Sequence, residues 1–143
     1  MPADETASEL LRAAEFRTAV RRFLLRTDQA AAAAGLTSQR YDLLLMIKSA
    51  DGGRSTVTEL ARRLYLAQPA ATELVKRAVA SGLVERSVSE HDRRVTLLRL
   101  TPEGERRLTQ AFVALRDDRR EAAAALRTVG STLRVLGSGQ TER

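Results

Sequence analysis

Two groups of side chains in the middle of the chain have the chemistry to bind a polyanion. The first group combines amide, hydroxyl and charged side chains at helical spacing: Gln68, Pro69, Thr72, Glu73, Lys76 and Arg77. The second is a charged run in which Asp92 precedes Arg93 and Arg94. Amide, hydroxyl and cationic groups hydrogen-bond the base edges and phosphates of duplex DNA. Both groups therefore indicate nucleic-acid binding, although each is also compatible with ordinary solvated surface.

The residue types on which most catalysis depends are scarce. The chain has no Cys, which excludes a thiol nucleophile, a disulfide and a Cys-ligated metal. Its single His, His91, stands in the charged run, where we expect it to be exposed to solvent. Gly-rich phosphate-binding loops are absent from the sequence. We therefore predict that the protein is not an enzyme and has no catalytic residues, no cofactor and no metal site.

Size and charge place the chain among globular proteins with an anionic partner. It has 143 residues, which suits a single domain, with 43% hydrophobic and 29% charged residues. The net charge is +6, and residues 54–101, with nine basic and five acidic side chains, hold +4 of it. No apolar run approaches the ~20 residues of a membrane span, and the N-terminus lacks signal-peptide features. We expect a cytoplasmic protein with no membrane partner.

The first polar group lies on a predicted amphipathic helix over residues 68–81. At ~100° per residue, its apolar side chains fall on the arc opposite the polar group: Ala71, Leu74, Val75, Ala78 and Val79. A short helix precedes it. That helix opens with Thr56 and Glu59, whose spacing is that of a capping box, with hydroxyl and carboxylate each bonded to a backbone N–H. A tight turn through residues 65–67 joins the two, which gives a helix-turn-helix.

The second group lies at the tip of a predicted hairpin. Residues 83–88 and 95–100 alternate apolar and polar side chains, as in antiparallel strands, and residues 89–94 connect them. A guanidinium at such a tip could enter a minor groove beside the one that holds the helix. Residues 54–56 form a candidate short strand, and Arg54 and Thr56 in it are candidate phosphate contacts.

Long helices flank this segment. The pattern predicts one helix over residues 8–34, a second that begins after Thr37, and a single long helix from Pro102 towards the C-terminus. The last helix carries a heptad-like apolar seam, which a lone domain of this size has no evident means to bury. We therefore predict a dimer interface built from both terminal helices: Phe16, Val20, Phe23, Leu108, Phe112, Leu115, Leu126 and Leu133. The alternative is that the seam packs on the chain's own first helix.

These motifs, in this order, resemble the MarR-type transcriptional regulators. The resemblance spans roughly residues 36–108 and rests on several short segments: Thr58-Glu59-Leu60-Ala61-Arg62-Arg63-Leu64, Thr72-Glu73-Leu74-Val75, Ser81-Gly82-Leu83-Val84-Glu85-Arg86, Asp92-Arg93-Arg94 and Leu100-Thr101-Pro102-Glu103-Gly104. Each segment is weakly diagnostic alone, and their order and spacing make the match strong. The resemblance implies a mainly α fold with a small β-hairpin, namely a winged helix-turn-helix with long N- and C-terminal dimerisation helices.

The resemblance also implies a function. It suggests a ligand-responsive repressor that binds a pseudo-palindromic operator as a homodimer, with the polar face of the helix over 68–81 in the major groove. Arg93 and Arg94 would form the wing tip, with Asp92 ion-paired to a wing arginine. A small aromatic or phenolic effector would enter a cleft near Tyr41, although Tyr41 also suits a hydrophobic core.

Domain limits follow from the same comparison. We expect an N-terminal dimerisation helix over residues 1–36, a DNA-binding lobe over 37–101, and a C-terminal dimerisation helix and tail over 102–143. A rival hypothesis is a winged-helix protein-interaction module without specific DNA binding, against which the basic polar face argues. The absence of Cys excludes the thiol-based oxidant sensing found in some family branches.

Overall fold

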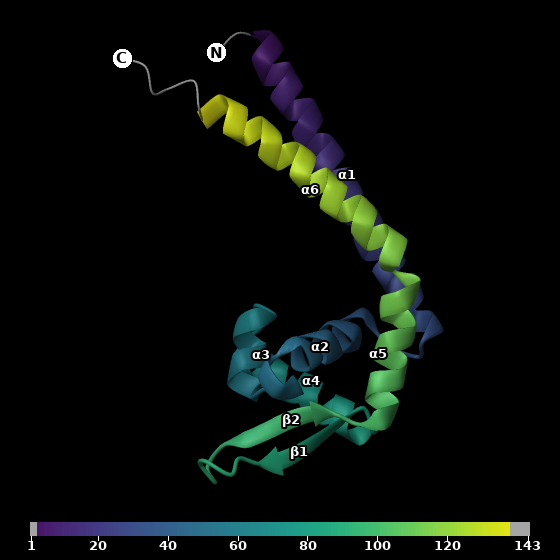
Figure 1. Ribbon diagram of the computed structural model, residues 1–143, viewed down its shortest axis with the longest axis vertical. Coiled ribbons are helices and arrows are strands. Elements are labelled where there is room, and N and C mark those ends of the chain that lie inside the picture. The colour runs from purple at the N-terminus through teal and green to yellow at the C-terminus, as the bar shows by residue number, and fades with distance from the viewer. Residues whose placement is uncertain (1–2, 138–143) are drawn as a thin grey trace. The chain divides into compact units, whose positions relative to one another are not determined.

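The computed structural model describes the backbone of residues 3–137 and the side chains of residues 3–129 (Figure 1). Its elements follow in this order: α1 (Ala3–Ala33), α2 (Ser38–Ser49), the 3-10 turn η1 (Asp51–Gly53), α3 (Val57–Arg63), α4 (Gln68–Ala80), β1 (Val84–Val88), β2 (Thr96–Leu100), α5 (Pro102–Ala114) and α6 (Arg116–Gly137). β1 and β2 form an antiparallel hairpin in which Val84 pairs with Leu100 and Val88 with Thr96. The mainly α winged helix-turn-helix predicted from the sequence is confirmed.

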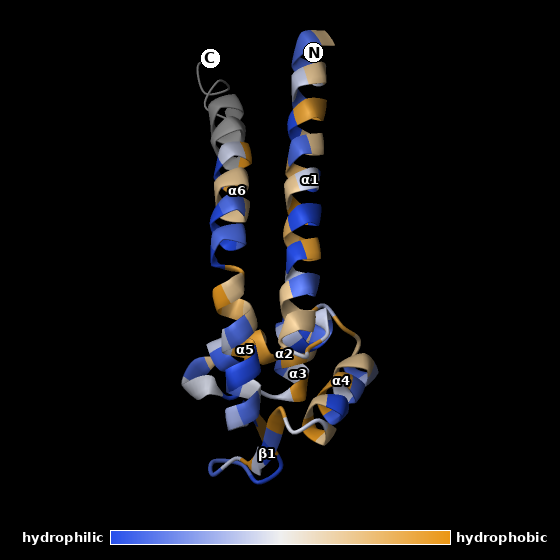
Figure 2. Ribbon diagram, turned by 90° about the vertical axis from the view of Figure 1, so that its right-hand side faces the viewer, coloured by the Kyte–Doolittle hydropathy of each residue, from blue (hydrophilic) through white to orange (hydrophobic). Residues whose placement is uncertain are grey.

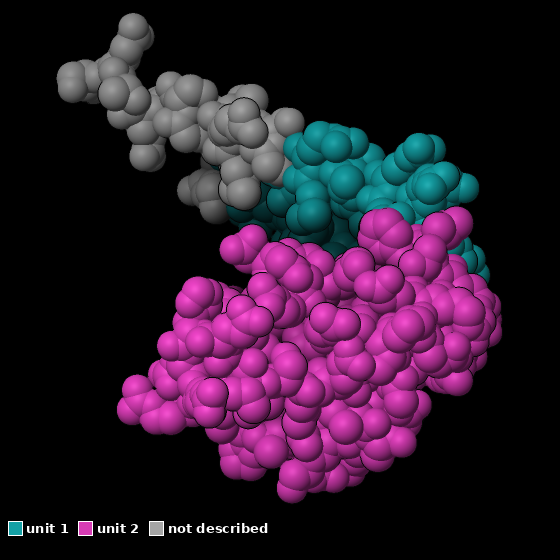
Figure 3. All heavy atoms as spheres, turned by 60° about the horizontal axis from the view of Figure 1, so that its bottom comes forward, with its two compact units in different colours: residues 1–27, 114–143 teal, residues 28–113 magenta. Residues whose placement is uncertain are grey.

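The chain forms two compact units (Figure 3). Residues 28–113 make up one unit, which we call the lobe, and residues 1–27 with 114–143 make up the other, which we call the terminal-helix unit. The sequence had suggested limits near residues 36 and 101. The lobe therefore includes the end of α1 and most of α5, in addition to the helix-turn-helix and hairpin.

The core of the lobe is aliphatic and draws on every element of the helix-turn-helix. Its fully buried side chains come from α2, α3, α4 and the hairpin: Leu43, Leu44, Ile47, Leu60, Val75, Leu83 and Leu98. Ser55 adds a single-residue bridge to Leu98 of β2, with N–H···O distances of 3.0 and 2.8 Å. The short strand expected over residues 54–56 is therefore one residue long, and it attaches the start of α3 to the hairpin.

Threonine caps fix where the lobe helices begin. The Thr37 hydroxyl accepts a hydrogen bond from the Arg40 N–H at 3.1 Å, and the Thr56 hydroxyl accepts one from the Glu59 N–H at 3.2 Å. The second half of the expected capping box is absent among the hydrogen bonds described for this segment. The Glu59 carboxylate instead accepts from the Arg62 guanidinium at 2.5 and 3.2 Å, because Arg62 lies one turn along the helix.

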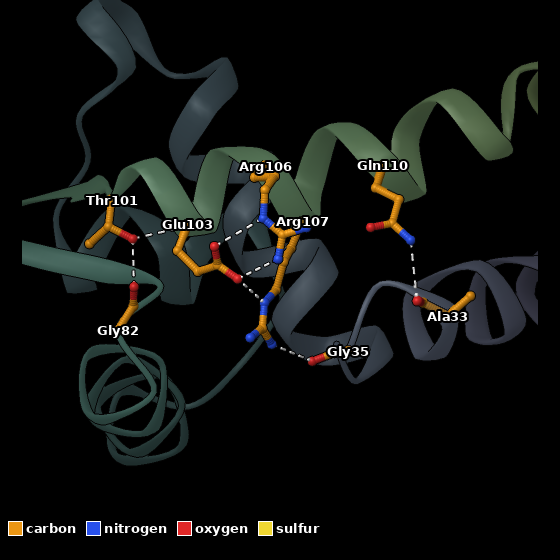
Figure 4. Close-up of polar contacts among 9 residues, drawn as sticks. Ala33, Gly35, Gly82, Thr101, Glu103, Arg106, Arg107 and Gln110 are labelled. Atoms are coloured by element: carbon orange, nitrogen blue, oxygen red, sulfur yellow. Dashed lines mark hydrogen bonds and ion pairs between the residues drawn. The ribbon is translucent and has the colours of Figure 1, made fainter.

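α5 is fastened to the rest of the lobe at several points along its length (Figure 4). The Thr101 hydroxyl accepts from the Gly104 N–H at 3.1 Å and donates to the Gly82 carbonyl at 2.5 Å. Further along, the Arg107 guanidinium donates to the Gly35 carbonyl at 3.0 Å, and Gln110 donates to the Ala33 carbonyl at 3.2 Å. These bonds hold α5 against both the start of the hairpin and the junction between α1 and α2.

The expectation of a single C-terminal helix is wrong. The helix is divided at Leu115, where α5 ends and α6 begins. Asp117 and Asp118 stand in the first turn of α6, where carboxylates are favoured by the positive end of the helix dipole. Leu115 itself is 1% exposed. A buried leucine and two acidic residues therefore mark the start of a new helix within a continuous apolar pattern.

Candidate nucleic-acid interface

α4 separates into two faces, as its pattern predicts. Ala71, Leu74, Val75 and Ala78 are buried against the lobe. The opposite face is exposed or, at Thr72, half-buried, and it carries the six residues predicted to read DNA: Gln68, Pro69, Thr72, Glu73, Lys76 and Arg77. Pro69 lies in the first turn of α4. The N-cap residue, Ala67, has no polar side chain that could accept hydrogen bonds from the first backbone N–H groups of the helix. The start of α4 therefore presents its backbone donors and its positive dipole end to an outside anion.

Contacts within α4, and one to α3, organise its polar face. The Gln68 amide donates to the Thr58 hydroxyl at 3.4 Å, and the Thr72 hydroxyl donates to the Gln68 carbonyl at 2.9 Å. Glu73 pairs with Arg77 at 3.3 Å, one turn apart. This pairing offsets the one negative charge on the face. The Lys76 ammonium and the amide of Gln68 are then the groups best placed to donate outward.

The hairpin tip is held in shape by Asp92. Its carboxylate accepts from the Arg94 backbone N–H at 3.0 Å and from the Arg94 guanidinium at 3.1 and 3.2 Å. The Arg94 guanidinium bonds, followed by the Arg94 N–H bond, lower the pKa of Asp92 from its usual value. The Arg94 side chain is nevertheless 91% exposed. The predicted ion pair between Asp92 and a wing arginine is present, and it leaves the arginine at the outer tip.

Backbone bonds complete the tip. The Val95 N–H donates to the Asp92 carbonyl and the Ser89 N–H to the Val95 carbonyl, both at 3.0 Å. Arg93 is exposed beside Arg94, and His91 is exposed as expected. Lower on the hairpin, Arg99 pairs with Glu85 directly across the strands at 2.6 Å. Arg93 and Arg94 are thus the arginines that the hairpin carries farthest from its base.

The candidate phosphate contacts lie where α3 begins. Arg54 is exposed immediately after η1, and Thr56 is half-buried because its hydroxyl caps α3. Arg54 lines a polar cavity of about 480 Å³ together with Lys48, Arg99 and Glu105, among others. Two cations of that cavity are already paired, Lys48 with Glu105 and Arg99 with Glu85, both at 2.6 Å. A phosphate role for Arg54 and Thr56 stays a prediction.

The remaining predicted site residues fall into three groups. Tyr41 is 4% exposed and belongs to the core of the lobe, so an effector cleft beside it stays a prediction. Phe16 and Phe23 are half-buried, and Val20, Phe112 and Leu126 are exposed. Leu108 and Leu115, predicted for the dimer interface, are 6% and 1% exposed in the single chain, and their role in an interface stays a prediction. Leu133 lies outside the residues whose side chains are described.

A family model and several solved structures among the comparisons with known proteins name the MarR family. Residues 34–95 match the model of the MarR family. This span is less than half of the chain, and over it the resemblance to the MarR family is confirmed. The matched span contains α2, the helix-turn-helix and the wing tip, which are the elements that carry the polar groups described above.

Individual relatives are similar along different lengths. A 54-residue stretch is 44% identical to an uncharacterised HTH-type transcriptional regulator, YsmB, of Bacillus subtilis (strain 168), and covers 38% of this chain and 37% of that protein. Two solved structures share the fold over 95% of this chain. One is a MarR mutant from E. coli complexed with operator DNA (20% identity, 99% of that chain, TM-score 0.68). The other is Sco3205 from Streptomyces coelicolor in complex with DNA (23% identity, 89% of that chain, TM-score 0.69).

Two further findings bear on the function classes. Family and fold are those of transcriptional regulators. Among the described residues, no helix is both long and apolar enough to cross a membrane. No sequence motif indicates a role for the turn before α4, where Tyr65 has a left-handed backbone conformation.

Proposed function

We propose that this protein is a sequence-specific, double-stranded DNA-binding transcriptional regulator of the MarR type that acts as a homodimer on a pseudo-palindromic operator. One observation carries the proposal: a single lobe presents the exposed polar face of α4 together with an arginine-tipped wing whose shape is held by Asp92. The fold is shared with two proteins that were solved bound to DNA. A helix of this kind fits a major groove and a guanidinium fits a minor groove.

Each group has a distinct task in this proposal. Gln68, Thr72 and Lys76, near the start of α4, contact base edges in the major groove, where the first residues of a recognition helix reach. Thr72 accepts a hydrogen bond from a base, since its own proton is used by the Gln68 carbonyl. Arg77 and the dipole at the start of α4 attract phosphates. Pro69 contributes apolar contact, and Glu73 keeps Arg77 extended along the helix.

The wing supplies a second contact beside the first. Arg93 and Arg94 lie against the adjacent minor groove, whose negative potential favours guanidinium groups. Arg54 and Thr56 bind phosphates between the two grooves. Asp92 orders the loop before binding, so that less conformational entropy is lost when the complex forms.

Dimerisation and ligand response complete the proposal. Two lobes on one operator bind half-sites one helical turn apart, about 34–36 Å, which requires a homodimer. The partner surface is the apolar side of the terminal helices, where Val20 and Leu126 are 39% and 58% exposed. We propose repression as the outcome, relieved by a small aromatic or phenolic effector that binds near α2. A melting-temperature screen with phenols and aromatic acids tests the effector: a hit raises the melting temperature and weakens operator binding.

The central experiment measures binding to an operator selected from random duplexes. Fluorescence anisotropy gives the Kd for that operator and for a scrambled duplex over a range of salt concentrations. We expect the operator Kd to rise steeply with salt, because each neutralised phosphate releases a counterion. Arg93→Ala and Arg94→Ala should each weaken binding about tenfold and reduce the salt slope by about 1.

The control is Arg120→Ala. Arg120 is also exposed, at 76%, but lies on α6, so it tests whether loss of any surface charge has the same effect. We expect near-parental affinity. Both wing variants are needed, because Arg94→Ala also removes the ion-pair partner of Asp92, whereas Arg93→Ala leaves that ion pair in place. If both wing variants bind like the parent, the wing has no role, and if the parent selects no duplex, the protein-interaction alternative replaces this proposal.

A further inference from the structure

The turn between α3 and α4 contains a backbone conformation that its side chain does not favour. Tyr65 has φ +54°, in the left-handed region, and it is the one residue other than glycine with positive φ in the described part of the chain. The turn ends α3 as a Schellman motif, with the Leu66 N–H bonded to the Ala61 carbonyl at 2.9 Å. Glycine is the usual residue at this position because it has no Cβ to clash.

The side chain of Tyr65 buries almost no surface against the rest of the protein. It is 96% exposed, whereas Tyr41, the other tyrosine of the chain, is 4% exposed and packs in the core. An aromatic ring stabilises a fold mainly by burying its surface, and Tyr65 buries almost none. The position therefore combines an unfavourable backbone conformation with a large side chain that buries almost no surface within its own molecule. This combination favours a contact with something outside the molecule.

The position of Tyr65 in the helix-turn-helix indicates what that partner is. Tyr65 stands three residues before Gln68, where α4 begins. The exposed guanidinium of Arg62 lies three residues before Tyr65, at the end of α3, and its pKa is raised chiefly by its hydrogen bond to Glu59, with a smaller contribution from Tyr65. When α4 enters a major groove, the preceding helix crosses the phosphate backbone, so the turn between them lies at the edge of the groove. Phosphate oxygens are the acceptors available there, and tyrosine hydroxyls are among their donors.

We propose that the Tyr65 phenol O–H donates a hydrogen bond to a backbone phosphate at the edge of the major groove read by α4. This inference rests on the proposed DNA-binding function and adds a contact to it. The contact is to phosphate, so it positions α4 without distinguishing one base sequence from another. The phenol is uncharged, so its contact releases no counterion.

The experiment compares Tyr65→Phe and Tyr65→Gly with the parent, using the selected operator and a scrambled duplex. Tyr65→Phe keeps the ring and loses only the donor, and we expect both affinities to fall by the same factor, about threefold to tenfold. The salt slope should not change. Tyr65→Gly relieves the backbone, so we expect a higher melting temperature together with binding at least as weak as that of Tyr65→Phe. A variant that is more stable yet binds more weakly cannot owe its loss of binding to misfolding.

Three results overturn the inference. If Tyr65→Phe binds both duplexes with the affinity of the parent, Tyr65 makes no phosphate contact, and the proposed function is unaffected. A loss confined to the operator makes Tyr65 a base-reading residue instead. If the parent binds neither duplex while Arg93→Ala and Arg94→Ala also change nothing, the proposed function fails, and the phosphate contact fails with it.

Discussion

At the scale of single residues, the chain uses ion pairs to orient arginines. Asp92 holds Arg94, Glu85 holds Arg99, and Glu73 holds Arg77, each pair at 3.3 Å or less. All of these pairs are largely exposed, and exposed pairs contribute little to stability. Their effect is on geometry, because a guanidinium with one fixed partner keeps its remaining N–H groups pointed outward. A regulator that binds phosphates depends on that orientation more than on the strength of the pair.

Glu103 makes the strongest of these arrangements and predicts how stability depends on pH. Its carboxylate accepts hydrogen bonds from Arg106 and from Arg107, at 2.6 and 2.8 Å, and these guanidinium groups lower its pKa from 4.5 to about 2 (Figure 4). Since the folded pKa lies below the unfolded one, the contribution is complete above about pH 4.5 and is lost as the pH falls towards 2.

The corresponding variant is Glu103→Gln. It lacks this contribution, so we expect a lower free energy of unfolding than the parent at pH 7 and a smaller difference between the two at pH 2. Urea titrations followed by circular dichroism at a series of pH values measure both. A difference between parent and variant that stays constant from pH 7 to pH 2 would contradict the low pKa.

At the scale of elements, the sequence predicted the lobe well and the terminal helices less well. The two faces of α4, the hairpin strands and the threonine caps at 37, 56 and 101 all depend on neighbours a few residues away, which periodicity and capping rules describe. The division between α5 and α6 at Leu115 does not depend on such local neighbours. The apolar spacing continues across it, so the start of α6 depends on packing of Leu115 and on acidic residues that the heptad pattern ignores.

The same reasoning explains what was missed in the candidate site. The wing arginines and the residues of α4 could be named because their types and spacing are informative. Tyr65 could not, since its left-handed backbone follows from how α3 ends rather than from the residue itself. The burial of Leu108 within the single chain could not be predicted either, because the apolar spacing does not tell which of its members the chain buries on its own.

The joint between α5 and the hairpin gives an element-scale prediction. Gly104 lies so close to Leu83 that a Cβ on it would stand 2.1 Å from the Leu83 carbonyl oxygen, which is backbone and has no room to move away (Figure 4 shows the adjacent Thr101–Gly82 bond). We expect Gly104→Ala to lower the free energy of unfolding by about 2–4 kcal/mol, despite the better helix propensity of alanine. Chemical denaturation measures the change.

Thr109→Ala is the matched control, since Thr109 is exposed on the same helix. Its effect should stay within about 0.5 kcal/mol. If Gly104→Ala is as stable as this control, α5 does not depend on its close approach to Leu83.

At the scale of the whole molecule, apolar surface remains on the terminal helices. Figure 2 shows apolar residues recurring along α1 between hydrophilic ones, and Leu10, Leu11, Leu24 and Leu25 are all more than half exposed. Exposed apolar residues that recur along a helix are typical of a surface that a partner covers. The homodimer of the proposed function supplies that partner from an identical surface.

The dimer is tested by placing charges on this surface. Val20 on α1 and Leu126 on α6 are exposed and apolar, so the double variant Val20→Asp with Leu126→Asp should dissociate, because two like charges per chain would be buried without partners. Sedimentation should then give the mass of one chain, against twice that mass for the parent. Operator affinity should fall by a factor of 10² or more, roughly the loss expected when two linked half-site contacts become independent.

The control tests whether a new charge anywhere on α1 has the same effect as a charge on its apolar side. Thr18→Asp places the same charge on an exposed position of α1 about 160° around the helix from Val20, at ~100° per residue. We expect this variant to remain dimeric and to bind the operator with at most a small loss from its added negative charge. If instead the double variant keeps the parental mass, the apolar sides of α1 and α6 do not form the interface, and the geometry that brings two copies of α4 to one duplex has to come from elsewhere on the chain.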